Sequence, residues 1–153
     1  MTTAAEKFRA LLREHTRYEG EAYNFLYEAL DYTNKNVIPK GRKGHVSGQE
    51  LLEGVRRHAI EQYGCMAGTV LESWGITKTD DVGKMVFYLV EKDLMGAQDS
   101  DREGDFHDVY DFGDVFDLKP VIGYNHDREE WLVAYVPRSN FGKAPGENLE
   151  RTA

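Results

Sequence analysis

Residues 22–33 read Ala-Tyr-Asn-Phe-Leu-Tyr-Glu-Ala-Leu-Asp-Tyr-Thr, and this stretch indicates the fold class most clearly. Its apolar positions recur every three or four residues, which is the period of an amphipathic α-helix. These positions are Ala22, Phe25, Leu26, Ala29, Leu30 and Thr33. Tyr23 and Tyr27 widen the apolar face and leave little polar face for water. We therefore predict a helix over residues 20–33 that is central to the core.

Further helices are predicted on both sides of this stretch. Thr3-x-x-Glu6 and Ser47-x-x-Glu50 match the capping box, in which a hydroxyl and a carboxylate satisfy backbone N–H groups at a helix start. Apolar residues at helical spacing follow each box and mark two later segments. The sequence thus predicts helices beginning near Thr3 and Ser47, and two more over about residues 65–74 and 80–93.

The apolar period changes after Gly96. Phe106, Tyr110 and Phe112 fall at even spacing, which favours a β-like segment. Residues 121–125 and 131–136 are rich in β-branched and aromatic side chains and flank a five-residue loop, so they predict a hairpin. The predicted fold is α+β, with about five helices followed by a small antiparallel sheet or hairpins. The order of the middle elements also fits a winged-helix-like arrangement.

Length and composition fit one globular domain. The chain has 153 residues, and 41% of them are hydrophobic, which is too many for a disordered chain. We expect a single α+β domain over residues 1–137 and a flexible C-terminal tail over 138–153. Cys65 is the only cysteine, so no internal disulfide is possible. No signal peptide or membrane-spanning run is recognisable, and we expect a cytoplasmic protein.

The net charge of −8 is unevenly distributed along the chain. Residues 1–60 carry 10 basic and 8 acidic side chains, whereas residues 61–153 carry 9 basic and 19 acidic ones. Residues 79–117 hold only three basic side chains against twelve acidic ones. Because phosphate contacts require a basic face, this distribution makes nucleic acid an unlikely partner and predicts no sequence-specific DNA binding.

Four segments together carry a family resemblance. They are residues 22–30, 45–54, 70–76 and 105–112, with the sequences AYNFLYEAL, HVSGQELLEG, VLESWGI and DFHDVYDF. In this order they resemble an uncharacterised family of small proteins from Planctomycetes and Verrucomicrobia, over about residues 20–118. The resemblance implies an intracellular bacterial protein. Because no activity is established for the family, it implies no catalytic residue.

An acidic segment is a candidate cation site. Asp99, Asp101, Glu103 and Asp105 have the spacing of the first ligands of an EF-hand loop. The twelfth position, where such a loop needs a bidentate Glu, is Tyr110. We therefore expect a solvated acidic turn, with a weak divalent-cation site as the alternative.

A short basic loop is a candidate anion site. Lys40, Arg42 and Lys43 are interspersed with two glycines just before the predicted start of a helix. Unpaired N–H groups at a helix start bind phosphate-like anions. The spacing differs from that of a Walker A loop, so a flexible, solvated loop is the favoured interpretation.

No catalytic set and no cofactor are predicted from the sequence. Cys65 follows Gly64 near a predicted helix start, where a thiolate is favoured, but a small buried residue is the commoner role. The five histidines are scattered and lack metal-ligand spacing; His58 in particular fits a buried core residue.

Three hypotheses for the function therefore stay open. The leading one is a non-enzymatic intracellular protein-interaction or regulatory domain, whose partner is another protein. The first alternative is a nucleic-acid-binding, winged-helix-like protein. The second is an enzyme whose residues converge only in three dimensions. An interaction domain predicts an exposed apolar patch, whereas an enzyme predicts a deep pocket with convergent polar groups.

Overall fold

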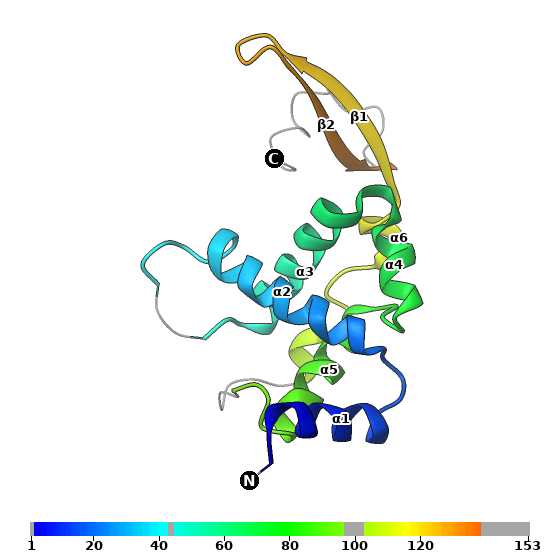
Figure 1. The fold of residues 1–153 in the computed structure, drawn as a ribbon. Coiled ribbons are helices and arrows are strands. Elements are labelled where there is room, and N and C mark those ends of the chain that lie inside the picture. Colours follow the sequence, from blue (N-terminus) through cyan, green and yellow to red (C-terminus); the bar gives the residue numbers. More distant parts are fainter. Residues whose placement is uncertain (1, 43–44, 97–102, 139–153) are drawn as a thin grey trace.

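The computed structural model describes residues 2–42, 45–96 and 103–138. In these parts of the chain, five helices of seven residues or more precede one two-stranded antiparallel sheet, which confirms the predicted α+β class (Figure 1). The longer helices are α1 Ala4–Glu14, α2 Gly20–Asn36, α3 Gly48–Tyr63, α4 Ala67–Ser73 and α5 Thr79–Glu91. The remaining elements are the 3-10 helices η1 Gly64–Met66 and η2 Glu103–Phe106, the single turn α6 Phe112–Val115, and the strands β1 Leu118–Asn125 and β2 Glu130–Pro137.

The capping residues predicted from the sequence occupy the starts of α1 and α3. Thr3 with Glu6 and Ser47 with Glu50 form complete capping boxes at the starts of α1 and α3. Gly64 ends α3 with a φ of 54°, a left-handed backbone angle that favours glycine. None of the described helices is long and apolar enough to cross a membrane.

The core forms around α2, as the apolar period of that helix predicts. Its buried residues are Ala22, Tyr23, Phe25, Leu26, Ala29 and Thr33. Tyr27, by contrast, lies at the edge of the core and donates a 2.8 Å hydrogen bond from its hydroxyl to the carbonyl of Leu94. Helix α3 crosses α2 so closely that a Cβ at Gly54 would overlap the hydroxyl of Thr33.

The segment between Phe106 and Phe112 is not a strand, and the β-like prediction for it is wrong. Phe106 is buried where the chain passes α3 and α5, and its ring lies close to Gly48 and its Cβ to Gly83. Further along, the Tyr110 hydroxyl donates to a carbonyl of α3, 2.7 Å away. The even spacing therefore reflects separate anchor points on the helices rather than a pleated strand.

The hairpin follows α6 rather than α5, so η2 and α6 separate it from the three middle helices. It contacts the body at η1 and extends away from the helices (Figure 1). Both strands are longer than predicted, and Asn125 pairs with Glu130 to close a four-residue turn. The side-chain oxygen of Asn125 accepts hydrogen bonds from the N–H groups of Asp127 and Arg128 and so fixes this turn. Residues 139–153, which include most of the predicted tail, lie outside the described residues.

Candidate functional site

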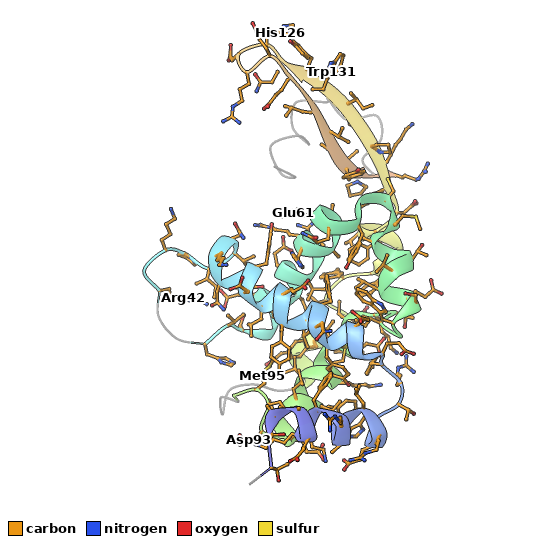
Figure 2. The ribbon with its side chains drawn as sticks, in the orientation of Figure 1. Arg42, Glu61, Asp93, Met95, His126 and Trp131 are labelled. Atoms are coloured by element: carbon orange, nitrogen blue, oxygen red, sulfur yellow. The ribbon has the colours of Figure 1, made fainter. Side chains whose placement is uncertain are left out.

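The hairpin Leu118–Pro137, called the arm below, exposes large apolar side chains to water. Trp131 is 72% exposed, Ile122 67% and Val133 55%, and Tyr124 and Leu132 are also exposed. Figure 2 shows Trp131 and His126 at the end of the arm that is farthest from the helices. Scattered surface leucines and valines are ordinary, but a contiguous group on one projecting element is typical of an interaction site.

The strand register gathers four of these side chains on one face. Ile122 lies opposite Val133, and Tyr124 lies opposite Trp131. Because cross-strand partners share a face and alternate residues return to it, all four side chains point to the same side. The rings of Tyr124 and Trp131 meet with their centroids 5.1 Å apart. Ile122, Tyr124, Trp131 and Val133 are called the apolar strip below.

The same face anchors the arm to the helical body. Tyr135 is two residues beyond Val133 on β2, and its ring packs against Gly64 of η1. Leu118, at the start of β1 on this face, is buried in the main core. The apolar face thus begins inside the core and continues into water, where no part of the described chain covers the strip.

The arm is electrically balanced in an otherwise acidic protein. Residues 118–138 carry three basic side chains, Lys119, Arg128 and Arg138, and three acidic ones, Asp127, Glu129 and Glu130. Since the whole chain has a net charge of −8, that excess lies entirely outside this segment. The arm therefore offers an apolar contact surface that has no strong positive or negative electrostatic potential.

An open cleft of about 430 Å³ lies at the base of the arm, between α4 and α6. Its lining residues are Cys65, Gly68, Thr69, Glu72, Ile76, Thr77, Phe112, Gly113, Phe116 and Asp117. Cys65 is exposed rather than buried, because η1 turns its side chain outward from the core. No histidine, lysine or arginine belongs to this lining among the described residues, so the cleft places no imidazole or cation beside the Cys65 thiol to favour its thiolate form.

Asp81 is the centre of a buried polar cluster that joins α5 to the segment between α1 and α2. Its carboxylate accepts hydrogen bonds from the Tyr18 hydroxyl at 2.5 Å and the Thr77 N–H at 2.9 Å, and Arg17 approaches to 3.4 Å. Burial alone would raise the pKa of Asp81, but these hydrogen bonds and the Arg17 charge outweigh it and hold the pKa below its usual value. Because every partner belongs to the fold, this cluster stabilises the structure.

Glu14, His15 and Glu91 bring potential metal ligands within 4.8 Å of one another where α1 and α5 end. The ring of His15 stacks on Tyr88 at 3.7 Å between centroids. Lys92 already neutralises Glu14, with 2.6 Å between Nζ and the carboxylate. Both glutamates are exposed, and exposed carboxylates of this kind are common without an ion.

The predicted acidic site falls mostly outside the described structure. Asp99 and Asp101 lie outside the described residues, and Glu103 begins η2. Asp105, also in η2, is exposed and lies beside Gly48 at the start of α3. The cation prediction for this turn therefore stays a prediction.

The predicted anion site is partly described. Lys40 is exposed, and Lys43 lies outside the described residues. Arg42 pairs with Glu50 at 2.6 Å, and this hydrogen bond is the main reason that the pKa of Glu50 falls to about 2. The carboxylate at the start of α3 thus already engages Arg42, one of the three cations that the prediction assigned to an external anion.

Sequence reasoning predicted the strands of the arm but not their role as an exposed surface. The available signal was that only two strands are predicted. A lone hairpin cannot bury both of its faces, so some of its apolar side chains must be covered by another part of the chain or by a partner. Searches against protein-family models, curated proteins and solved structures each gave no match to this chain.

Proposed function

We propose that this chain is a non-enzymatic protein-interaction domain and that its arm carries the contact surface. The observation that supports the proposal is the apolar strip, which leaves Trp131 72% exposed on an element that projects from the helical body. Covering apolar surface gains roughly 25 cal/mol for each Å² removed from water. A partner that covers the strip therefore gains free energy from removing these apolar side chains from water.

The chemistry of the strip favours a protein surface over nucleic acid. Tyrosine and tryptophan are enriched at the energetic centres of protein interfaces, where an aromatic side chain fills a pocket of the partner. A nucleic-acid site would combine such rings with a surplus of Lys and Arg, whereas the arm has as many acidic as basic side chains.

The strip also favours binding over catalysis. Catalytic sites are concave and combine a nucleophile or acid with a base and a polar environment. The strip is a projecting apolar face, and the cleft at the base of the arm surrounds Cys65 with carboxylates and rings and, among the described residues, with no histidine. Binding is therefore the activity to which the exposed chemistry of this part of the chain is suited.

Site-specific photo-crosslinking in the cells that make this protein tests the proposal. A photoreactive residue is placed at Ile122 or Trp131, and at exposed Asp31 of α2, outside the arm, as the control. The proposal predicts one shared partner at the two arm positions and none at the control. The purified partner should then bind the chain at least about tenfold more weakly after Trp131→Ala. Equal capture at all three positions, or unchanged affinity of Trp131→Ala, would show that the arm is not the contact surface.

A further inference from the structure

We infer that the partner of the arm is a second copy of this chain, packed against the apolar strip across a two-fold axis. This inference rests on the proposed function, because it assigns an occupant to the same surface. A two-fold contact requires a surface that complements itself. The strip meets this condition because it is apolar and built from two cross-strand pairs, so Ile122 and Val133 of one chain can pack on the same residues of the other.

The distribution of charge favours this occupant. Two chains of net charge −8 repel each other wherever their acidic bodies approach, but residues 118–138 carry no net charge. Projection of the arm from the body keeps the acidic helices apart while the strips meet (Figure 1). Apolar contact between two copies therefore meets no net charge repulsion between the arms themselves.

The charges within the arm also select the direction of pairing. The tip of the arm, residues 126–130, carries one basic and three acidic side chains. At the base of the arm lie Lys119 and Arg138, and Arg138 pairs with Asp117 at 2.9 Å. Antiparallel arms related by a two-fold axis place each acidic tip toward the base of the other chain, where Asp117, Lys119 and Arg138 together leave one net positive charge. Arms that pointed the same way would bring like charges together.

Two other modes of association fit less well. Insertion into a lipid surface would have to carry the charged tip through the headgroups first, and three of its four charged residues are acidic. Edge-to-edge pairing of strands would meet Pro120 on β1 and Pro137 on β2, each of which lacks an N–H donor. Face-to-face packing uses the apolar side chains and requires no donor from either edge.

The exposed area predicts a weak dimer. An aromatic side chain carries roughly 150–250 Å² of surface, so the four exposed side chains of the strip offer on the order of 500 Å² in each chain. A stable interface of standard size buries about 800 Å² on each partner. The polar residues of the tip and base add to this area. The total buried area then lies at the small end of specific interfaces, and we expect a dissociation constant of roughly micromolar.

Sedimentation equilibrium of the full chain tests the inference. The apparent mass should rise from 17.5 kDa toward twice that value as the concentration rises from about 1 to 200 µM. The double substitution Ile122→Thr/Val133→Thr keeps β-branched side chains and should weaken the dimer at least about tenfold. Val109→Thr, the same change at an exposed site on the body, should leave it within about twofold. A monomer throughout, or equal effects of the two variants, would overturn the inference.

A charge-swap experiment supplies a readout that local unfolding cannot imitate. A tip variant, Glu129→Lys/Glu130→Lys, and a base variant, Lys119→Glu/Arg138→Glu, each place like charges together in an antiparallel dimer. Each variant alone should associate more weakly than the parent chain, and their mixture should restore association because both ends are again complementary. A mixture as weak as the separate variants would overturn the antiparallel dimer.

The outcomes separate this inference from the proposed function. If the chain stays monomeric but a different protein crosslinks at Ile122 and depends on Trp131, the proposed function holds and the dimer inference is wrong. If two copies associate and the association is unaffected by the strip substitutions, the dimer inference is wrong, and the crosslinking at Ile122 and Trp131 decides the proposed function separately.

Discussion

The ring of Tyr135 lies against the α-carbon of Gly64, and a Cβ at that glycine would come within 2.7 Å of the ring. Gly64 also has a φ of 54°, so a side chain there is opposed by both the backbone and the neighbouring ring. This contact joins β2 to η1 and fixes the point from which the arm projects. The position of the proposed contact surface thus depends on one residue that ends α3.

Gly64→Ala should therefore loosen the arm and destabilise the fold. A left-handed non-glycine residue costs about 1–3 kcal/mol, and displacement of the Tyr135 ring adds to that cost. Urea unfolding gives the change in stability, and hydrogen exchange shows whether protection is lost first in β1 and β2. Gly123→Ala is the matched control, because a Cβ there meets nothing within 4 Å and should change stability by less than about 0.5 kcal/mol. Equal effects of the two substitutions would contradict the anchor.

Gly54→Ala should destabilise the crossing of α2 and α3. The added methyl group would overlap the hydroxyl of Thr33, which hydrogen-bonds to the carbonyl of Ala29 at 2.7 Å. Overpacking of this kind costs about 1–3 kcal/mol, and adding Thr33→Ala should recover part of it by removing the hydroxyl. Thermal unfolding of both variants provides the comparison. Gly20→Ala, whose Cβ would make an ordinary 3.7 Å contact with Leu12, should be neutral or stabilising.

Asp81→Asn should make the protein less stable near neutral pH but not in strong acid. Because the folded-state pKa of Asp81 lies below its usual value of 3.8, its contribution is present above that pH and is lost as the pH falls through the folded value. Unfolding free energies at pH 6 should therefore differ between the parent chain and the variant, and the gap should close below about pH 4. A gap that is constant with pH would mean that the carboxylate charge has no part in the stabilisation.

His107 and Asp80 should give stability the opposite dependence on pH. The 2.7 Å hydrogen bond between them raises the pKa of His107 and lowers that of Asp80. A group with a raised folded-state pKa stabilises below its ordinary value of 6.5 and loses that effect as the pH rises through the folded value. The advantage of the parent chain over His107→Gln should be visible at pH 6 and decline toward pH 9. If the advantage grows toward pH 9, the assigned ion pair is wrong.

Local patterns predicted the helices and the hairpin because each rests on residues close in sequence. The period of Ala22–Thr33, the capping boxes and the glycine at position 64 determine where helices lie and end. The conformation of Phe106–Phe112 was predicted wrongly because it depends on residues distant in sequence. Thr79 accepts a hydrogen bond from the Val109 N–H and donates one to the Phe106 carbonyl.

The candidate site could not be predicted for a related reason. Alternation along residues 121–136 indicates strands but not whether another layer covers them. The apolar strip becomes a surface only because the rest of the described chain packs elsewhere, with Tyr135 anchored at Gly64 and Trp131 left in water. Whether a side chain is exposed depends on how the whole chain packs, so it cannot be predicted from the spacing of residues along the sequence.

The fluorescence of Trp131 provides the most direct test that the strip is a contact surface for a second copy. Trp74→Phe leaves Trp131 as the only tryptophan of the chain. In dilute solution its emission should be that of a water-exposed indole and should be quenched readily by acrylamide. As the concentration rises through the micromolar range, the emission should shift to the blue and the quenching should fall, with the midpoint matching the dimer dissociation constant. Emission and quenching that stay unchanged at every concentration would contradict the account.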